Sequence, residues 1–165
     1  MTYVVERLSE HHRTAVIDIF NIFVTTGFSA YPETEVSYAF FDRFLEMAQG
    51  YPAVAIKDQT GRVVGFAILR AYHFARTFAR TAEVSYFLLP EATRQGVGTM
   101  ILEMFVQEAK KMGIDSIVAS ISSRNEESIR FHLKNGFQEC GRLRAIGKKF
   151  GEDFDVVWMQ RPLRS

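Results

Sequence analysis

The sequence has little of several residues and patterns that mark specialised proteins: it contains one cysteine, four prolines and no long apolar run. The single cysteine, Cys140, excludes an internal disulfide and a zinc site built from several cysteines. We interpret Cys140 as a small buried strand residue rather than a catalytic nucleophile. A nucleophilic cysteine would be accompanied by a motif that contains histidine, and the sequence has no such motif near Cys140.

Signals for export, membranes and nucleic acids are also missing. The first residues, MTYVVERLSEHHR, lack the apolar segment of a signal peptide, and no run approaches the ~18 apolar residues of a membrane span. The formal net charge of +1 offers no electrostatic case for binding nucleic acid or an anionic membrane. The sequence therefore predicts a cytoplasmic protein without a nucleic-acid or membrane partner.

The chain is instead rich in apolar residues. Hydrophobic residues make up 47% of it and aromatic residues 13%, with 15 Phe, a composition typical of a well-packed globular protein. No repeat, low-complexity block or Pro/Gly-rich linker interrupts the sequence. We therefore predict a single domain spanning residues 1–165.

The apolar pattern predicts alternating strands and helices. Strands are expected at residues 3–8, 52–58, 63–72, 82–89, 115–122, 137–147 and 154–161. Helical spacing predicts helices at residues 10–26 after Ser9, from Thr34 to Gly50, at 97–112, and at 126–134 after Asn125. The strand at 82–89 is the most apolar, which favours a central place in the sheet. This order indicates an α/β fold with a mixed sheet.

A glycine-rich turn joins the central strand to the helix that follows it. The stretch TRQGVGTMIL, residues 93–102, places Gly96 and Gly98 where the first helical N–H groups have no intrahelical partner, which favours an anion such as phosphate. The pattern G-x-G-x-x-G fails at Ile101, and the stretch GRLRAIGKK does not have the spacing of a Walker loop. Glycines needed only for close helix–strand packing remain the alternative.

Two neighbouring stretches narrow these possibilities. The run EVSYFLLPEATRQGVGTMIL, followed by NEESIRFHLKNGF, resembles the GNAT superfamily of N-acetyltransferases. Three further stretches, FNIFVTTGF, TAEVS and GRLRAIGKKFGEDFDVVWMQ, resemble its phosphinothricin and methionine sulfoximine acetyltransferase branch. The resemblance implies a mixed, mostly antiparallel central sheet, splayed at the acetyl-CoA site and flanked by helices.

The resemblance also implies a set of residues that hold acetyl-CoA. They lie on the central strand, on the glycine turn and at the start of the next helix, and comprise Tyr86, Phe87, Leu88, Arg94, Gln95, Gly96, Val97, Gly98, Thr99, Asn125 and Ser128. The backbone N–H of Leu88 is expected to polarise the thioester carbonyl. The sequence departs from the family at Thr93, where Gln or Arg is usual, and weaker CoA binding is expected. From the letters alone, an ordinary buried strand is an equal alternative for residues 86–88.

Two side chains are expected to carry the chemistry. In the family, the position of Glu83 holds the carboxylate that takes the amine proton, and the position of His132 holds the acid that protonates the departing thiolate. The alternatives are a surface carboxylate at a strand end and a histidine that caps or packs a helix. His11 and His12 are interpreted as surface residues, and no metal is implied.

The acceptor side is expected to include Phe28, Tyr31, His73, Arg76, Phe78 and Ser85, because the matching segments line the acceptor pocket in the family. Arginine forks suit the carboxylate or phosphinate oxygens of an amino-acid-like acceptor, whereas a solvated basic loop is the alternative. The segment AYPET is shorter than usual, and Asp153 stands where relatives have Trp, so the acceptor match is the loosest. The branch commonly forms homodimers.

The sequence thus predicts an enzyme that moves acetyl from acetyl-CoA directly to the primary amine of a small amino-acid-like acceptor of the phosphinothricin, methionine sulfoximine or methionine sulfone type. A protein or peptide N-acetyltransferase is the alternative within this chemistry. A non-catalytic acyl-CoA-binding sensor is the alternative outside it.

Overall fold

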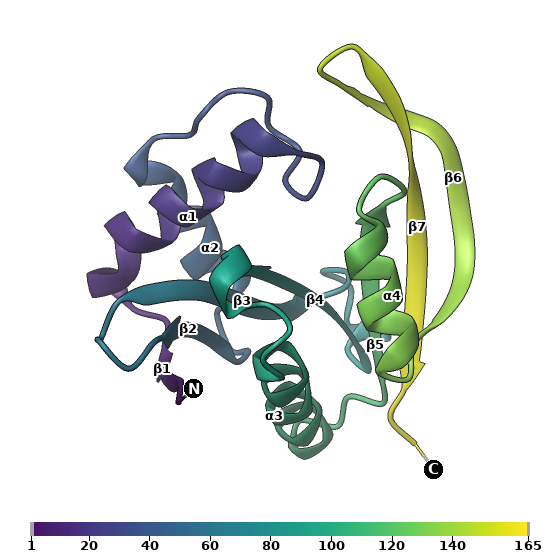
Figure 1. The fold of residues 1–165 in the computed structure, drawn as a ribbon. Coiled ribbons are helices and arrows are strands. Elements are labelled where there is room, and N and C mark those ends of the chain that lie inside the picture. Colours follow the sequence, from purple (N-terminus) through teal and green to yellow (C-terminus); the bar gives the residue numbers. More distant parts are fainter. Residues whose placement is uncertain (1, 165) are drawn as a thin grey trace.

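A computed structural model describes residues 2–164 and contains a seven-stranded sheet in the order β1-β2-β3-β4-β5-β7-β6 (Figure 1). The strands are β1 (Val4–Arg7), β2 (Ala53–Lys57), β3 (Val63–Ala71), β4 (Thr81–Leu88), β5 (Ser116–Ser122), β6 (Gln138–Lys149) and β7 (Glu152–Pro162). The α-helices are α1 (Arg13–Thr26), α2 (Phe41–Met47), α3 (Val97–Lys111) and α4 (Glu126–Lys134). Short 3-10 turns are η1 (Glu10–His12), η2 (Tyr38–Phe40), η3 (Arg76–Phe78) and η4 (Pro90–Ala92). The predicted mixed α/β fold is confirmed.

Strand β4 lies in the middle of the sheet, as its apolar sequence predicts, and separates two cores. On one face Val84 packs with Leu102 and Phe105 of α3. On the other face Phe87 packs in the cluster that α1 and α2 supply, where it contacts Phe20. Figure 1 shows α1 and α2 on one side of the sheet and α3 on the other. No helix among residues 2–164 is long and apolar enough to cross a membrane.

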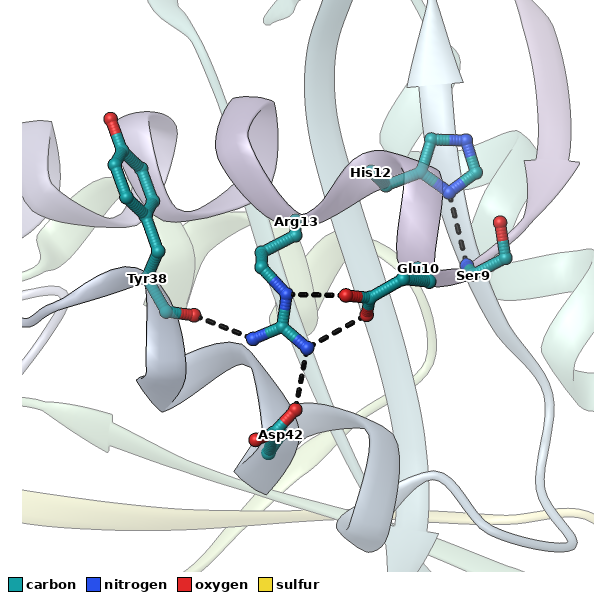
Figure 2. Close-up of polar contacts among 6 residues, drawn as sticks. All are labelled: Ser9, Glu10, His12, Arg13, Tyr38 and Asp42. Carbon is teal, nitrogen blue, oxygen red and sulfur yellow. Dashed lines mark hydrogen bonds and ion pairs between the residues drawn. The ribbon is translucent and has the colours of Figure 1, made fainter.

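A buried histidine, His12, caps the start of α1. The backbone N–H of Ser9 donates to Nδ1 of His12 at 3.0 Å, and Nε2 of His12 lies 3.3 Å from a carboxylate oxygen of Glu6 (the Ser9 contact is drawn in Figure 2). The expectation that His12 is a surface residue is therefore wrong, because its ring satisfies a backbone donor that the first turn leaves unpaired. His11 is exposed as expected.

Arg13 connects the start of α1 to α2. Its guanidinium donates to the Glu10 carboxylate at 2.7 Å, to Asp42 at 2.6 Å and to the Tyr38 carbonyl at 2.8 Å, as Figure 2 shows. The two carboxylates raise the pKa of Arg13 above its ordinary value. These contacts orient α1, whose C-terminal end leads into the loop at residues 27–31.

The second helix begins later than the sequence predicts. Thr34 caps no helix, and residues 31–37 run without helical structure until η2 and then α2, which begins at Phe41. The cause is Asn21 on α1: its side chain accepts from the Val36 N–H at 2.8 Å and donates to the Val36 carbonyl at 3.0 Å. Because the backbone groups of Val36 are bound to this side chain, they are not free for a helical turn.

Strands β4 and β5 run parallel but separate after a short contact. They pair only from Thr81 with Ser116 to Glu83 with Val118, while β4 goes on pairing with β3 as far as Leu88. On its other edge β5 pairs with β7 along its whole length. The sheet is therefore split beyond Glu83, which is the splayed arrangement that the family resemblance implies.

Strands β6 and β7, residues 138–162, form a long antiparallel arm at the edge of the sheet (Figure 1). Among the described residues β6 pairs only with β7, and almost all of its side chains are exposed. Cys140 lies on β6 and is exposed, so the expectation of a buried strand residue is wrong. The sequence suggests a strand there but does not show that this strand lies at the edge, where neither face is covered.

Candidate active site

The split between β4 and β5 opens into a cavity of about 560 Å³. The cavity is bounded by the two parting strands, the glycine turn, α4 and the end of α1. Its lining residues are Phe23, Ser29, Val84, Ser85, Tyr86, Phe87, Leu88, Thr93, Arg94, Gly96, Gly98, Thr99, Ala119, Ser120, Ile121, Ser122, Asn125, Glu127, Ser128, Arg130, Phe131, His132, Lys134 and Asn135. The sequence predictions for the central strand, the glycine turn and α4 therefore meet at one place.

The glycine turn forms one end of this cavity. Gly96 precedes α3 with a φ of 80°, a left-handed conformation that glycine adopts without strain. The first N–H groups of α3 have no partner within the helix, and the helix dipole is positive there, so this end of the cavity suits an anion. Gly98 packs against the ring of Phe131, and a Cβ there would lie 3.0 Å from a ring carbon. The turn thus combines close packing at Gly98 with backbone N–H groups that suit an anion.

The flanking residues of the turn differ in their exposure. Arg94 lies at the cavity with a mostly exposed side chain, whose guanidinium is 3.9 Å from Glu127. Gln95 is exposed and Val97 is buried in the core, and neither lines the cavity. Thr93 donates its hydroxyl to the Pro90 carbonyl at 2.7 Å, so this side chain serves the turn itself.

The free edge of β4 supplies backbone donors and acceptors. The N–H of Leu89 donates to Val64 of β3 at 2.9 Å. Because successive backbone groups of a strand point to opposite edges, the N–H groups of Tyr86 and Leu88 are directed to the edge where β5 has departed. Both residues line the cavity. A ligand with amide groups can therefore pair with this edge as an additional strand would.

Glu83 lies at the point where the two strands separate. The residue is 7% exposed and does not itself line the cavity. Its carboxylate accepts from Arg70 at 2.9 Å and from the hydroxyl of Ser120, which does line the cavity, at 3.2 Å. The alternative of a surface carboxylate at a strand end is therefore wrong. The sequence analysis does not identify Arg70 or Ser120 as partners of Glu83. The register of the β3–β4 hairpin places Arg70 opposite Glu83, so the pairing of these two strands is a signal from which Arg70 could be predicted.

His132 lies in the wall of the cavity and is neutral. Its residue exposure is 2%, and Nδ1 lies 2.7 Å from the backbone carbonyl of Ser128, which can only accept, so Nδ1 carries the proton. Nε2 is buried and has no partner among the described residues. Burial lowers the pKa of His132 to about 4, partly offset by the Ser128 carbonyl. A proton on Nε2 is therefore disfavoured at neutral pH.

Tyr86 lies next to His132, with ring centroids 5.5 Å apart. Its hydroxyl is also buried without a partner among the described residues, and burial raises the pKa of Tyr86. A buried hydroxyl and a buried ring nitrogen without partners are costly to the folded state. Both groups lie in the cavity wall, so a bound ligand could form hydrogen bonds with the Tyr86 hydroxyl and with Nε2 of His132.

Asn125 connects α4 to the loop that follows α1. Its side-chain oxygen accepts from the Ser128 N–H at 3.3 Å, which caps α4, and its amide donates to the Ser29 hydroxyl at 3.2 Å. The predicted capping role is confirmed. Asn125, Ser128 and Ser29 all line the cavity.

An aromatic wall stands beside the cavity. Tyr31 stacks on Phe154 of β7 with centroids 5.6 Å apart, and Phe28 contacts the rings of Phe154 and Phe150. Burial raises the pKa of Tyr31, and the charge of Glu83 contributes to the same shift. Tyr31 therefore lies close enough to Glu83 to be affected by its charge, although Phe28 and Tyr31 do not line the cavity itself.

The predicted acceptor residues of the β3–β4 loop lie elsewhere. His73, Arg76 and Phe78 are exposed, and none of them lines the cavity. His73 instead packs on Phe74 and Phe78 with centroids 4.5 Å and 4.8 Å away. Ser85, the remaining predicted acceptor residue, does line the cavity. Within the single chain, Ser85 therefore lines the cavity, whereas the β3–β4 loop does not.

Comparison with known proteins agrees with this arrangement. Residues 16–137 match the acetyltransferase (GNAT) family, so the chain belongs to that family. It is 30% identical over 149 residues to the L-methionine sulfoximine/L-methionine sulfone acetyltransferase of Pseudomonas paraeruginosa, covering 88% of this chain and 86% of the relative. It is 29% identical to the phosphinothricin N-acetyltransferase of Streptomyces coelicolor, covering 67% of this chain and 64% of the relative.

A solved structure shows the same fold with a ligand. The GNAT superfamily phosphinothricin acetyltransferase from Sinorhizobium meliloti, in complex with acetyl-CoA, superposes with a TM-score of 0.91 at 30% identity. The match covers 98% of this chain and 89% of the other. The protein is therefore an acetyltransferase of this family.

Proposed function

We propose that the protein transfers acetyl from acetyl-CoA directly to the primary amine of a small amino-acid-like acceptor, such as methionine sulfoximine, methionine sulfone or phosphinothricin. The observation that carries this proposal is the split between β4 and β5, with a glycine turn at one end and buried Glu83 at the other. The names of the relatives support the class of acceptor.

The residues present suit acetyl-CoA, which supplies an activated acetyl thioester. The N–H groups at the start of α3 and the side chain of Arg94 would hold its phosphates. The free edge of β4, at Tyr86 and Leu88, would pair with the amides of its pantetheine arm. The Leu88 N–H is the donor we assign to the oxyanion that develops during acyl transfer.

Glu83 is the base in this proposal. It lies at the end of the split, where an amine entering beside Tyr31 would meet the thioester carbonyl. The Arg70 guanidinium and the Ser120 hydroxyl keep Glu83 in one place, and a carboxylate there can accept the amine proton, directly or through water.

The geometry does not support His132 as the acid predicted from the family pattern. Donation from Nε2 requires a ring that is protonated twice, and burial disfavours that form at neutral pH. We assign the thiolate's proton to the attacking amine, which must release protons as its bond to the acetyl carbon forms. His132 then serves as a neutral hydrogen-bond acceptor in the cavity wall.

We also propose that the protein acts as a homodimer. Leu143 and Ile146 on β6 are 45% and 57% exposed, and Phe74 on the neighbouring loop is 94% exposed. The ring of Tyr72 lies 6.2 Å from Trp158 of β7, so the β3–β4 loop contacts the β6–β7 arm. An edge strand of this kind is usually covered.

We propose the cytoplasm as the place of action. Cys140 is exposed and free, and an exposed thiol fits a reducing compartment.

The test of the proposed reaction is acceptor-dependent release of CoA thiol from acetyl-CoA. Methionine sulfoximine, methionine sulfone and phosphinothricin are compared with the common amino acids, a peptide panel and a blank without acceptor. We expect release with at least one of the first three. Release only with peptides would favour a protein N-acetyltransferase, and tight acetyl-CoA binding without any release would favour the sensor.

Glu83→Gln tests the assignment of the base. We expect kcat to fall by about 10² or more, because general base catalysis contributes roughly 10²–10⁴. The Kd for CoA, measured by calorimetry, should remain as in the wild type. Glu91→Gln, which changes an exposed carboxylate paired with Arg62, is the matched control and should leave both quantities unchanged. Unchanged turnover in Glu83→Gln at neutral pH would refute the assignment.

A further inference from the structure

Lys149, near the tip of the β6–β7 arm, is the one buried cation among the described residues. The whole residue is 1% exposed, although it ends a strand whose other side chains are mostly exposed. Its ammonium donates to the carbonyls of Gly27 and Ala30, each at 2.6 Å. No carboxylate forms an ion pair with Lys149 among the contacts of the described residues. Burying an ammonium without an ion pair is costly, and here the two carbonyls and the ring of Phe150, whose centroid is 4.9 Å away, replace its water.

The first carbonyl bound by Lys149 belongs to the C-terminal end of α1. Gly27 directly follows Thr26, the last residue of α1, and caps the helix with extended backbone. The last carbonyls of a helix lack partners and carry the negative end of its dipole. An ammonium is favourable at this position. The second carbonyl, of Ala30, lies three residues further along, so Lys149 holds both ends of the intervening turn.

The residues inside this turn face the cavity and the aromatic wall. Ser29 lines the cavity and accepts from Asn125, while Phe28 lies against Phe150 and Phe154. Tyr31, directly after Ala30, stacks on Phe154. The 27–31 loop is therefore fastened by Asn125 on the side of the cavity and by Lys149 on the side of the arm.

We propose that Lys149 is a positioning residue for the acceptor: by binding the Gly27 and Ala30 carbonyls, it holds the 27–31 loop so that Phe28 and Tyr31 form, with Phe154, an aromatic wall beside Ser29 of the cavity. This inference rests on the proposed function, since it assigns that wall to the acceptor. Lys149 itself does not contact the reacting atoms. It acts through the loop, so its loss should affect the acceptor and leave the acetyl-CoA side intact.

The test compares Lys149→Met with Lys148→Met. Methionine keeps the length of the side chain without the ammonium, and Lys148 is the neighbouring exposed lysine, 3.7 Å from Asp153. We expect Lys149→Met to raise KM for methionine sulfoximine at least about tenfold, because a displacement of about 1 Å can cost roughly 10²-fold. KM for acetyl-CoA should stay within about twofold of the wild type in both variants.

A second measurement does not depend on activity. Backbone ¹⁵N order parameters of Phe28, Ser29 and Tyr31 should be about 0.85 in the wild type and in Lys148→Met, and fall below about 0.6 in Lys149→Met. Lys149→Gln, which keeps two N–H donors without the charge, should fall between these values and serves as the readout if Lys149→Met does not fold.

The outcomes separate the two proposals. Order parameters and acceptor KM unchanged in Lys149→Met would overturn the positioning role, as would equal increases in KM for acetyl-CoA and acceptor. If the wild type acetylates none of the acceptors, the proposed function fails, and the order parameters alone decide whether Lys149 holds the loop.

Discussion

At the scale of single residues, the site is marked by three buried ionisable side chains, each stabilised in a different way. Glu83 is paired with Arg70, Lys149 donates to two backbone carbonyls, and His132 is neutral with its Nδ1 proton on a carbonyl. A buried ionisable group must find a partner or give up its charge. Arg70 and the carbonyls of Gly27 and Ala30 come from other elements, and the burial of His132 is set by the elements around α4, so the state of each group follows from the fold.

His132 predicts a specific dependence of stability on pH. Its pKa is about 4 in the folded protein against an ordinary value of 6.5. Between these values the unfolded chain binds more protons, so the free energy of unfolding falls as the pH drops from 6.5 towards 4. At pH 5 this loss is roughly 2 kcal/mol, at 1.36 kcal/mol per pH unit.

His132→Phe should remove this part of the pH dependence. We expect urea unfolding at pH 7.5 and pH 5 to show a smaller loss of stability in His132→Phe than in the wild type, by roughly 2 kcal/mol. His11→Phe changes the exposed neighbour of His12 and should keep the wild-type dependence. Equal losses in all three proteins would show that His132 is not held neutral by burial.

At the scale of elements, the site depends on where strands separate and where they stay together. Strand β4 leaves β5 after Glu83 and keeps β3, which creates the cavity and frees one edge of β4. On the other side, β6 and β7 stay paired far enough to bring Phe154 against Tyr31. Gly147 lies opposite Phe154, and its missing side chain leaves the space in which that ring lies.

Gly147→Ala should therefore disturb the aromatic wall. A Cβ at this position would overlap the Phe154 ring, and such overpacking costs roughly 1–3 kcal/mol. The free energy of unfolding, measured with urea, should fall by this amount. Gly141→Ala on the same strand meets no atom within 4 Å and should change stability by less than about 0.5 kcal/mol. Equal effects of the two substitutions would contradict this packing account.

At the scale of the whole molecule, two cores hold the sheet while the β6–β7 arm extends beyond it (Figure 1). The tip of the arm returns to the body through Lys149 and the Phe150 N–H, which donates to Glu33 at 2.7 Å. The outer side of β6 has no such partner among the described residues. The arm thus contacts the 27–31 loop at its tip, and along its length it presents the outer edge of β6, where Leu143 and Ile146 are exposed between charged side chains.

Ile146→Glu tests whether this edge is the dimer interface. Sedimentation equilibrium of the wild type should give twice the chain mass of 18.9 kDa, and the variant should give the mass of one chain. A charge placed in an apolar interface is not compensated there. Met104→Glu, on the exposed side of α3, should leave the dimer intact. A wild-type monomer, or a dimer that persists in Ile146→Glu, would contradict the proposed interface.

Most elements follow from local pattern. The helix at 126–134 was predicted from Asn125 as its cap, and the central strand from its continuous apolar run, because capping and burial are properties of neighbouring residues. The segment from Thr34 was predicted wrongly because Asn21, on another helix, binds its backbone. Cys140 and His12 were placed wrongly for the same reason: their exposure depends on which elements cover them.

The sequence by itself determined the alternation of elements, the glycine turn at Gly96 and the family, since these depend on residues that lie close together along the chain. Only the tertiary structure decided that Glu83 is buried against Arg70 and Ser120, that His132 is neutral, and that Lys149 donates to the Gly27 and Ala30 carbonyls. Protonation and orientation depend on burial and on partners far away in the sequence, and these exist only once the chain is folded.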